Sequence, residues 1–188
     1  MFETRQRALS SLLLSTCFLL AVVLFGAQPA RADSAGDLFE SLNERLGFMR
    51  DVARYKAQQQ LPIEDLPREA IVLQNSAAAA AAAGLEPDSV VAFFTMQITL
   101  AKVIQFRQRA DLLTAATSLE ALDLDGEIRP ALDLLGERII VQLADRLHTR
   151  GPITEADWAQ FDHSVREAYL SLPEKRLLFE SLLPVRAR

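Results

Sequence analysis

Cysteine and histidine are scarce in this 188-residue sequence, which has one cysteine, Cys17, and two histidines. The cysteine lies in an N-terminal apolar run, so the chain beyond that run has no thiol and no disulfide. This excludes thiolate catalysis and cysteine-ligated zinc there. His148 and His163 are fifteen residues apart, and we expect them on different helices at the surface. The sequence therefore indicates no metal site.

Strand patterns and glycine-rich loops are also lacking. No alternation of apolar and polar residues exceeds five positions, no repeat is evident, and no glycine-rich phosphate loop is present. A sheet and a phosphate-binding loop are thereby excluded. What remains is helical periodicity, so we predict an all-α fold with one domain of five to six helices.

The first 32 residues have the features of a signal peptide. Arg5 and Arg7 precede an uncharged apolar run, Leu9 to Gly26, and Ala30-Arg31-Ala32 supplies small residues before a cleavage site. We predict a signal peptide over 1–32, a domain over 33–188 and a periplasmic or secreted location. An uncleaved anchor is the alternative. Lipid attachment at Cys17 fits less well, because a threonine precedes it.

The remaining chain is acidic. Without Arg5, Arg7, Arg31 and Glu3, residues 33–188 carry 17 basic and 24 acidic side chains, a net charge of −7. This charge argues against nucleic acid and against an anionic membrane surface as partners. A chain of this length can bury a core large enough for a single domain. Because residues 33–188 have no cysteine, no disulfide can stabilise that core, and packing alone must do so.

Capping residues and prolines divide the chain into helices. Asp65 is a good N-cap with Pro67 in the following turn, Gly84 suits a helix end, and Thr154 with Asp157 suits another helix start. Residues 114–126 are predicted as a loop. The first four expected helices are 34–60, 65–83, 87–113 and 127–149. A fifth begins at 154 and carries Trp158, Phe161 and Tyr169 as core residues. A short sixth helix follows Pro173 and ends near 183.

Several polar side chains fall where helices can direct them to one place. Arg45 and Lys56 are eleven residues, about three turns, apart and share a helix face. Arg68 lies in the first turn after the Asp65 cap, where free backbone N–H groups favour an oxygen-rich ligand. Gln97, Ala101 and Gln105 share a face at four-residue spacing. Each residue alone could be an ordinary surface or capping residue.

Together, these spacings resemble the exported, AroQ-type (gamma subclass) chorismate mutases over roughly residues 38–145. The resemblance implies rearrangement of chorismate to prephenate, with no cofactor and no metal. It also implies that Arg45 binds a substrate carboxylate, that Lys56 reaches the ether oxygen and a carboxylate, and that Gln105 donates to that oxygen from the other side. Arg129 is similar to a second carboxylate-binding arginine. The complete expected site comprises Arg45, Lys56, Asp65, Arg68, Glu69, Val72, Ala101, Gln105 and Arg129.

One position departs from the family. Relatives often have a serine or threonine at the position of Ala101, so a hydroxyl contact is missing and weaker binding is expected. Relatives have either a glutamine or a glutamate at the position of Gln105. A glutamate must be protonated to donate a hydrogen bond, whereas the amide of Gln105 donates at any pH. We therefore predict an activity that varies little between pH 5 and 8. With Arg45, Lys56, Arg68 and Arg129 opposed by Asp65 and Glu69, a dianionic substrate would make the site nearly neutral.

Two other functions are compatible with the sequence. An isochorismate-pyruvate lyase uses the same scaffold, and a non-catalytic exported helical module, such as a chaperone or sensor domain, fits the composition equally well. The resemblance implies a homodimer, although Arg129 in the same chain makes a second subunit unnecessary for the site.

Overall fold

The computed structural model describes residues 34–114 and 120–188, and the side chains from Asp37 onward. The predicted signal peptide lies outside the described residues. The segment from Asp33 to Arg188 forms a compact unit of its own. Within the described ranges there are six α-helices and no strand, as predicted. Their bounds are α2 Ser34–Gln58, α3 Leu66–Ala82, α4 Pro87–Leu112, α5 Arg129–Arg150, α6 Trp158–Ser164 and α7 Leu172–Leu182.

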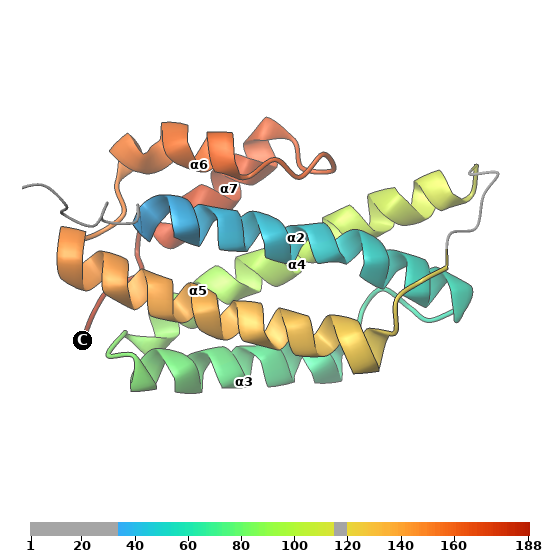
Figure 1. Ribbon diagram of the computed structural model, residues 1–188, viewed down its shortest axis with the longest axis horizontal. Coiled ribbons are helices and arrows are strands. Elements are labelled where there is room, and N and C mark those ends of the chain that lie inside the picture. The colour runs from blue at the N-terminus through green and yellow to red at the C-terminus, as the bar shows by residue number, and fades with distance from the viewer. Residues whose placement is uncertain (1–33, 115–119) are drawn as a thin grey trace, which may run out of the picture. The chain divides into compact units, whose positions relative to one another are not determined.

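Three long helices form the centre of the bundle. Helix α2 packs on both α4 and α5, and α3 lies along α4 and α5 on the other side (Figure 1). Helix α4 is apolar and long enough to cross a membrane, but half of its most apolar window is buried inside the bundle. Ten of its residues, including Gln97, Ala101 and Gln105, are buried, as expected of a central helix.

The helix ends follow the local signals. The Asp65 side chain accepts a hydrogen bond from the Arg68 N–H and caps α3, which continues through the alanine run. Gly84 ends this segment with a φ of 75°, a conformation that favours glycine. Thr154 and Asp157 form the predicted capping box, and a second box is built from Ser171 and Glu174.

The prediction of a loop over residues 114–126 is partly wrong. Residues 115–119 lie outside the described ranges, and Leu124–Ile128 form a π-helical turn, η1, that leads into α5. The Asp123 carbonyl accepts from the Ile128 N–H at 3.0 Å. A Cβ at Gly126 would lie 2.6 Å from an Asp123 side-chain oxygen, so a larger residue there would have to displace the Asp123 side chain.

The predicted fifth helix is shorter than expected. A 3-10 turn, η2 (Glu155–Asp157), precedes α6, which ends at Ser164, so Tyr169 lies outside it. The cause is tertiary: the Arg166 N–H donates to the Asn43 side chain at 2.7 Å, which draws the backbone towards α2. Trp158 and Phe161 do pack in the core, where Phe161 lies 5.2 Å from the rings of both Phe39 and Phe179.

Candidate functional site

Arg45 enters the site from the middle of α2. Only 6% of the residue is exposed, its Nη1 donates to the Gln97 side chain at 3.4 Å, and its guanidinium lies 5.7 Å from the centre of the Phe94 ring. Burial lowers the pKa of Arg45 to about 10, an effect that the nearby Asp133 carboxylate opposes. The group therefore stays cationic at neutral pH, and its Nε has no hydrogen-bond partner among the described residues.

Lys56 lies three turns further along α2. It is also only 6% exposed, and its Nζ donates to the Ile63 carbonyl at 2.5 Å. Burial lowers the pKa of Lys56, whereas the charge of Asp65 raises it and that of Arg129 lowers it. A cation with a single carbonyl partner in a low-dielectric site is a strong donor for an anionic ligand.

Gln105 faces these cations from α4. It is 5% exposed, so it is no surface glutamine. Its amide nitrogen donates to the Ala101 carbonyl at 3.2 Å and lies 3.8 Å from the Met49 sulfur. Sulfur is a weak acceptor, so one N–H of this amide can be redirected to a ligand at little cost.

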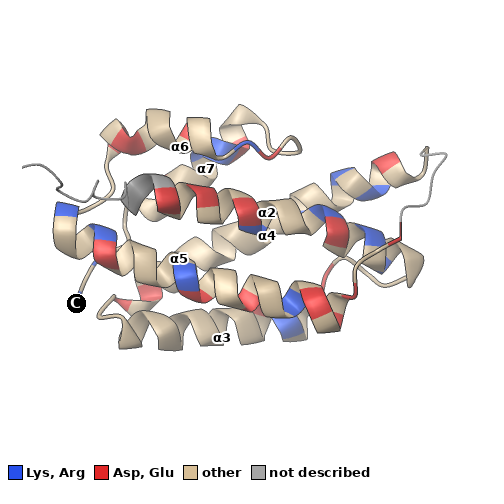
Figure 2. Ribbon diagram, viewed as in Figure 1, with Lys and Arg blue, Asp and Glu red and all other residues tan. Residues whose placement is uncertain are grey.

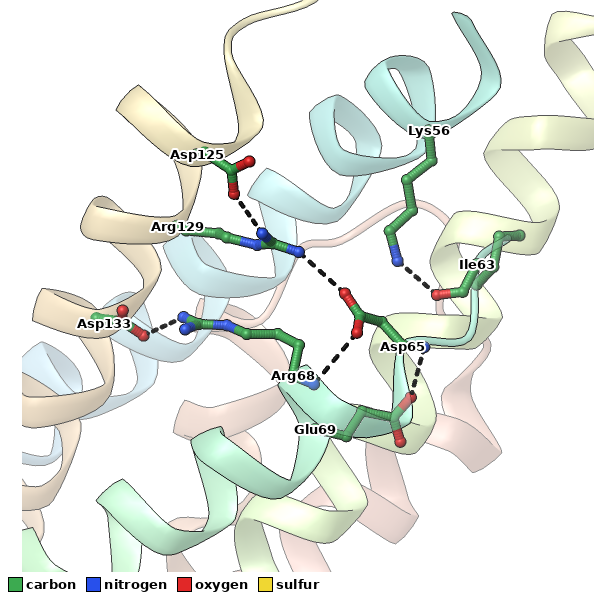
Figure 3. Close-up of polar contacts among 8 residues, drawn as sticks. All are labelled: Lys56, Ile63, Asp65, Arg68, Glu69, Asp125, Arg129 and Asp133. Atoms are coloured by element: carbon green, nitrogen blue, oxygen red, sulfur yellow. Dashed lines mark hydrogen bonds and ion pairs between the residues drawn. The ribbon is translucent and has the colours of Figure 1, made fainter. Parts of the chain in front are cut away.

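Two ion pairs cross between α3 and α5 in opposite directions (Figure 3). Arg129 reaches from the start of α5 to Asp65 at 2.9 Å and also pairs with Asp125, one turn earlier in the chain. Arg68 reaches from α3 to Asp133 on α5 at 2.5 Å. Figure 2 shows the charged residues gathered where these ends of α3 and α5 meet, whereas the rest of α3 is nearly uncharged.

The start of α3 is fixed by Asp65 and Glu69. While Asp65 caps the helix, one Glu69 oxygen lies 3.5 Å from the Asp65 N–H and the other accepts from Lys102 at 3.1 Å. Lys102 also lies 3.6 Å from Glu64. Both oxygens of Glu69 therefore have partners, which holds this carboxylate at the edge of the site.

These side chains surround one cavity of about 100 Å³. All nine residues predicted from the sequence line it. Eight further lining residues were not predicted from the sequence: Met49, Val52, Ile63, Ile98, Lys102, Leu124, Leu132 and Asp133. Two of them, Lys102 and Asp133, are charged. Five cations and three carboxylates give the wall a net charge of +2. Such a cavity can bind a small dianion and place fixed donors around its oxygens.

A metal has no evident place in this arrangement. No group of three or more His, Cys, Asp or Glu side chains suited to a metal occurs in the described part of the chain. His148 and His163 are both exposed, as expected.

The comparisons with known proteins agree with this chemistry. The profile of the family described as chorismate mutase type II matches residues 36–106, which include every expected site residue except Arg129. A secreted chorismate mutase of Yersinia pestis is 31% identical over 98% of this chain and 96% of its own length. The chain belongs to the type II chorismate mutases.

A second relative in sequence and one solved structure extend the likeness. A monofunctional chorismate mutase of Enterobacter agglomerans is 36% identical over 89% of this chain and 91% of its own length. The crystal structure of the Yersinia pestis secreted chorismate mutase superposes with a TM-score of 0.76, at 33% identity over 81% of this chain and 99% of that one.

The similarity is wider than the expected 38–145. An alignment over 98% of the chain includes α6 and α7, so these helices are shared with the Yersinia pestis chorismate mutase in sequence as well as in helicity. That relative is named as secreted, which supports an exported chorismate mutase, in the periplasm or beyond.

Proposed function

We propose that this chain rearranges chorismate to prephenate in the cavity between α2, α3, α4 and α5. The reaction occurs within one molecule: a C–O bond breaks while a C–C bond forms, and negative charge grows on the ether oxygen. A catalyst for it must hold the folded conformer and offer donors at that oxygen. The observation that carries the proposal is the meeting of the Lys56 ammonium and the Gln105 amide in one cavity with a net charge of +2.

Each of the nine predicted side chains has a role in this proposal. Lys56 and Gln105 donate to the ether oxygen from α2 and α4, and the transition state strengthens both bonds because charge develops there. Arg45 and Arg129 bind the two carboxylates. Asp65, Arg68 and Glu69 orient the ring and its hydroxyl, and Val72 and Ala101 provide apolar wall.

The charges support a dianionic substrate. Two carboxylates brought into a wall of net charge +2 leave the occupied site nearly neutral, which limits the cost of burying these groups. Small-molecule sites usually enclose about 300–1,000 Å³, more than the 100 Å³ observed here. Binding therefore requires the Arg129 side chain to move away from Asp65 and Asp125, and a substrate carboxylate replaces part of what those ion pairs lose.

The test is turnover of chorismate by the purified protein, with the product identified. Prephenate is expected. With isochorismate as a second substrate, release of pyruvate and an aromatic acid would instead identify an isochorismate-pyruvate lyase, and binding of apolar peptides without turnover of either substrate would identify a non-catalytic module. The family and the relatives named chorismate mutase favour neither alternative.

All of the proposed contacts come from a single chain. Arg129, which supplies the second carboxylate site, lies in the same cavity as Arg45. A second subunit is therefore not required for the chemistry, and the expected homodimer stays a prediction that sedimentation or light scattering can check.

A further inference from the structure

Asp133 lines the cavity without a role in the proposed chemistry. It lies on α5 four residues after Arg129, so both side chains lie on the same face of the helix. Its carboxylate accepts a hydrogen bond from the Arg68 Nη2 at 2.5 Å. The Asp133 side chain is 46% exposed and the Arg68 side chain is 24% exposed. Among the described residues, Asp133 is the one side-chain partner of Arg68.

We propose that Asp133 is a positioning residue, which fixes the Arg68 guanidinium across the cavity so that its remaining N–H groups can bind a substrate oxygen. This inference rests on the proposed function. Arginine has a planar fork of five donors on a flexible stem, and pairing one nitrogen with a carboxylate on the opposite helix restricts that stem. A cation already held in place loses less conformational freedom when it binds the substrate.

Asp133 also balances the charge of two neighbouring cations. Burial is the main cause that lowers the pKa of Arg45, the Asp133 carboxylate raises it, and Arg68 lowers it. Both Asp133 and Arg68 are thus close enough to Arg45 for their charges to act on it. Without the carboxylate, Arg68 and Arg45 would repel each other in a partly buried site, and Arg68 would turn towards solvent.

The next turn of α5 supplies a matched control. Glu137 carries the same charge four residues further on and, like Asp133, borders the neighbouring groove between α3 and α5. It makes no ion pair with any residue that the structure describes. Glu137→Ala therefore removes a similar long-range charge while it leaves the position of Arg68 unchanged.

The experiment is a double-mutant cycle on the purified protein, with kcat and KM for chorismate measured for the parent, Asp133→Ala, Arg68→Ala and the double variant. We expect Asp133→Ala to lower kcat/KM about fivefold, chiefly through a higher KM, but to cause no further loss in the Arg68→Ala background. Asp133→Asn, which keeps an acceptor without the charge, should lie between Asp133→Ala and the parent. Glu137→Ala should remain within about twofold of the parent.

Each other outcome overturns the inference. Equal losses from Asp133→Ala in both backgrounds would show that Asp133 acts independently of Arg68. An unchanged kcat/KM, or an increase, would show that the carboxylate is idle or competes with the substrate. Thermal unfolding of every variant detects a loss of fold, in which case Asp133→Asn takes the place of Asp133→Ala in the cycle. A parent that does not convert chorismate would refute the proposed function itself, whereas turnover with additive losses refutes this inference alone.

Discussion

Removal of the Lys56 ammonium should reduce activity far more than stability. Lys56→Ala deletes one of two donors proposed for the ether oxygen and lowers the net charge of the cavity wall from +2 to +1. The loss of one preorganised donor costs about 3 kcal/mol of transition-state stabilisation. At 1.36 kcal/mol for each tenfold change in rate, kcat/KM should fall roughly 150-fold.

The free energy of unfolding should change little, because two effects oppose each other. The charge of Lys56 is disfavoured by burial, so its removal relieves a cost of folding. The hydrogen bond to the Ile63 carbonyl, which contributes about 1 kcal/mol, is lost. Lys56→Met keeps the aliphatic length and should show the same loss of activity without the cavity that alanine leaves.

The assay follows the loss of chorismate absorbance with parent, Lys56→Ala, Lys56→Met and Lys102→Met. Lys102→Met is the matched control, because it removes an equal charge from the same wall while the Lys102 ammonium already faces Glu69 and Glu64. A loss of only a few-fold is expected from that control. Equal losses at both lysines would refute the donor role and indicate a general charge effect, and turnover of Lys56→Met within about tenfold of the parent would refute the assignment outright.

The pH dependence gives a second check on Lys56. Burial lowers the pKa of this amine below its ordinary 10.5 in the unliganded protein, so the ammonium is lost at a lower pH than in a free lysine. Log kcat/KM should therefore fall on the alkaline side with an apparent pKa below 10.5. The fall in kcat should come at higher pH, because the bound dianion stabilises the ammonium. If the activity of Lys56→Met falls at the same alkaline pH as that of the parent, a group other than Lys56 causes the fall.

Three further predictions concern other parts of the molecule. Gln105→Glu should replace the flat profile between pH 5 and 8 by one that favours acid, since only the protonated carboxyl donates; a flat profile in this variant would remove Gln105 from the mechanism. Ala101→Ser should lower KM about fivefold with kcat nearly unchanged, because its hydroxyl can donate to a substrate carboxylate; an unchanged KM would show that the hydroxyl does not reach it. Glu174→Gln should lower stability at pH 7, because the hydrogen bonds from Arg107 hold the pKa of Glu174 at about 2, below its ordinary 4.5. This stabilisation is complete above pH 4.5 and is lost as the pH falls towards 2, so the parent and the variant should converge in acid denaturation curves.

The sequence predicts those features that depend on a few neighbouring residues. The Asp65 cap, the capping box of Thr154 and Asp157, and the end of the second helix at Gly84 each satisfy backbone groups within the same turn. Their positions therefore follow from residue type and spacing alone. The end of α6 does not, because it depends on a hydrogen bond from Arg166 to Asn43 across 123 residues.

The same distinction explains which site residues were missed. In the sequence, Lys102 and Asp133 have the features of ordinary charged residues on the solvent faces of their helices. They line the site because α3 lies against both α4 and α5, which brings Lys102 to Glu69 and Asp133 to Arg68. One available signal was the four-residue spacing from Arg129 to Asp133, which predicts a shared helix face.

The carboxylates among the cations are best understood as part of the binding site. Five cations on four helices would repel one another in a cavity of this size, and folding would be opposed by the charge that recognises the substrate. Asp65, Glu69 and Asp133 reduce this repulsion, yet they leave a net charge of +2, the amount that two substrate carboxylates neutralise. Among the described residues, Lys56 has no carboxylate in direct contact and donates to a carbonyl instead. Its charge is therefore not neutralised by an ion pair, which is the property required of a donor to a transition state that gains negative charge.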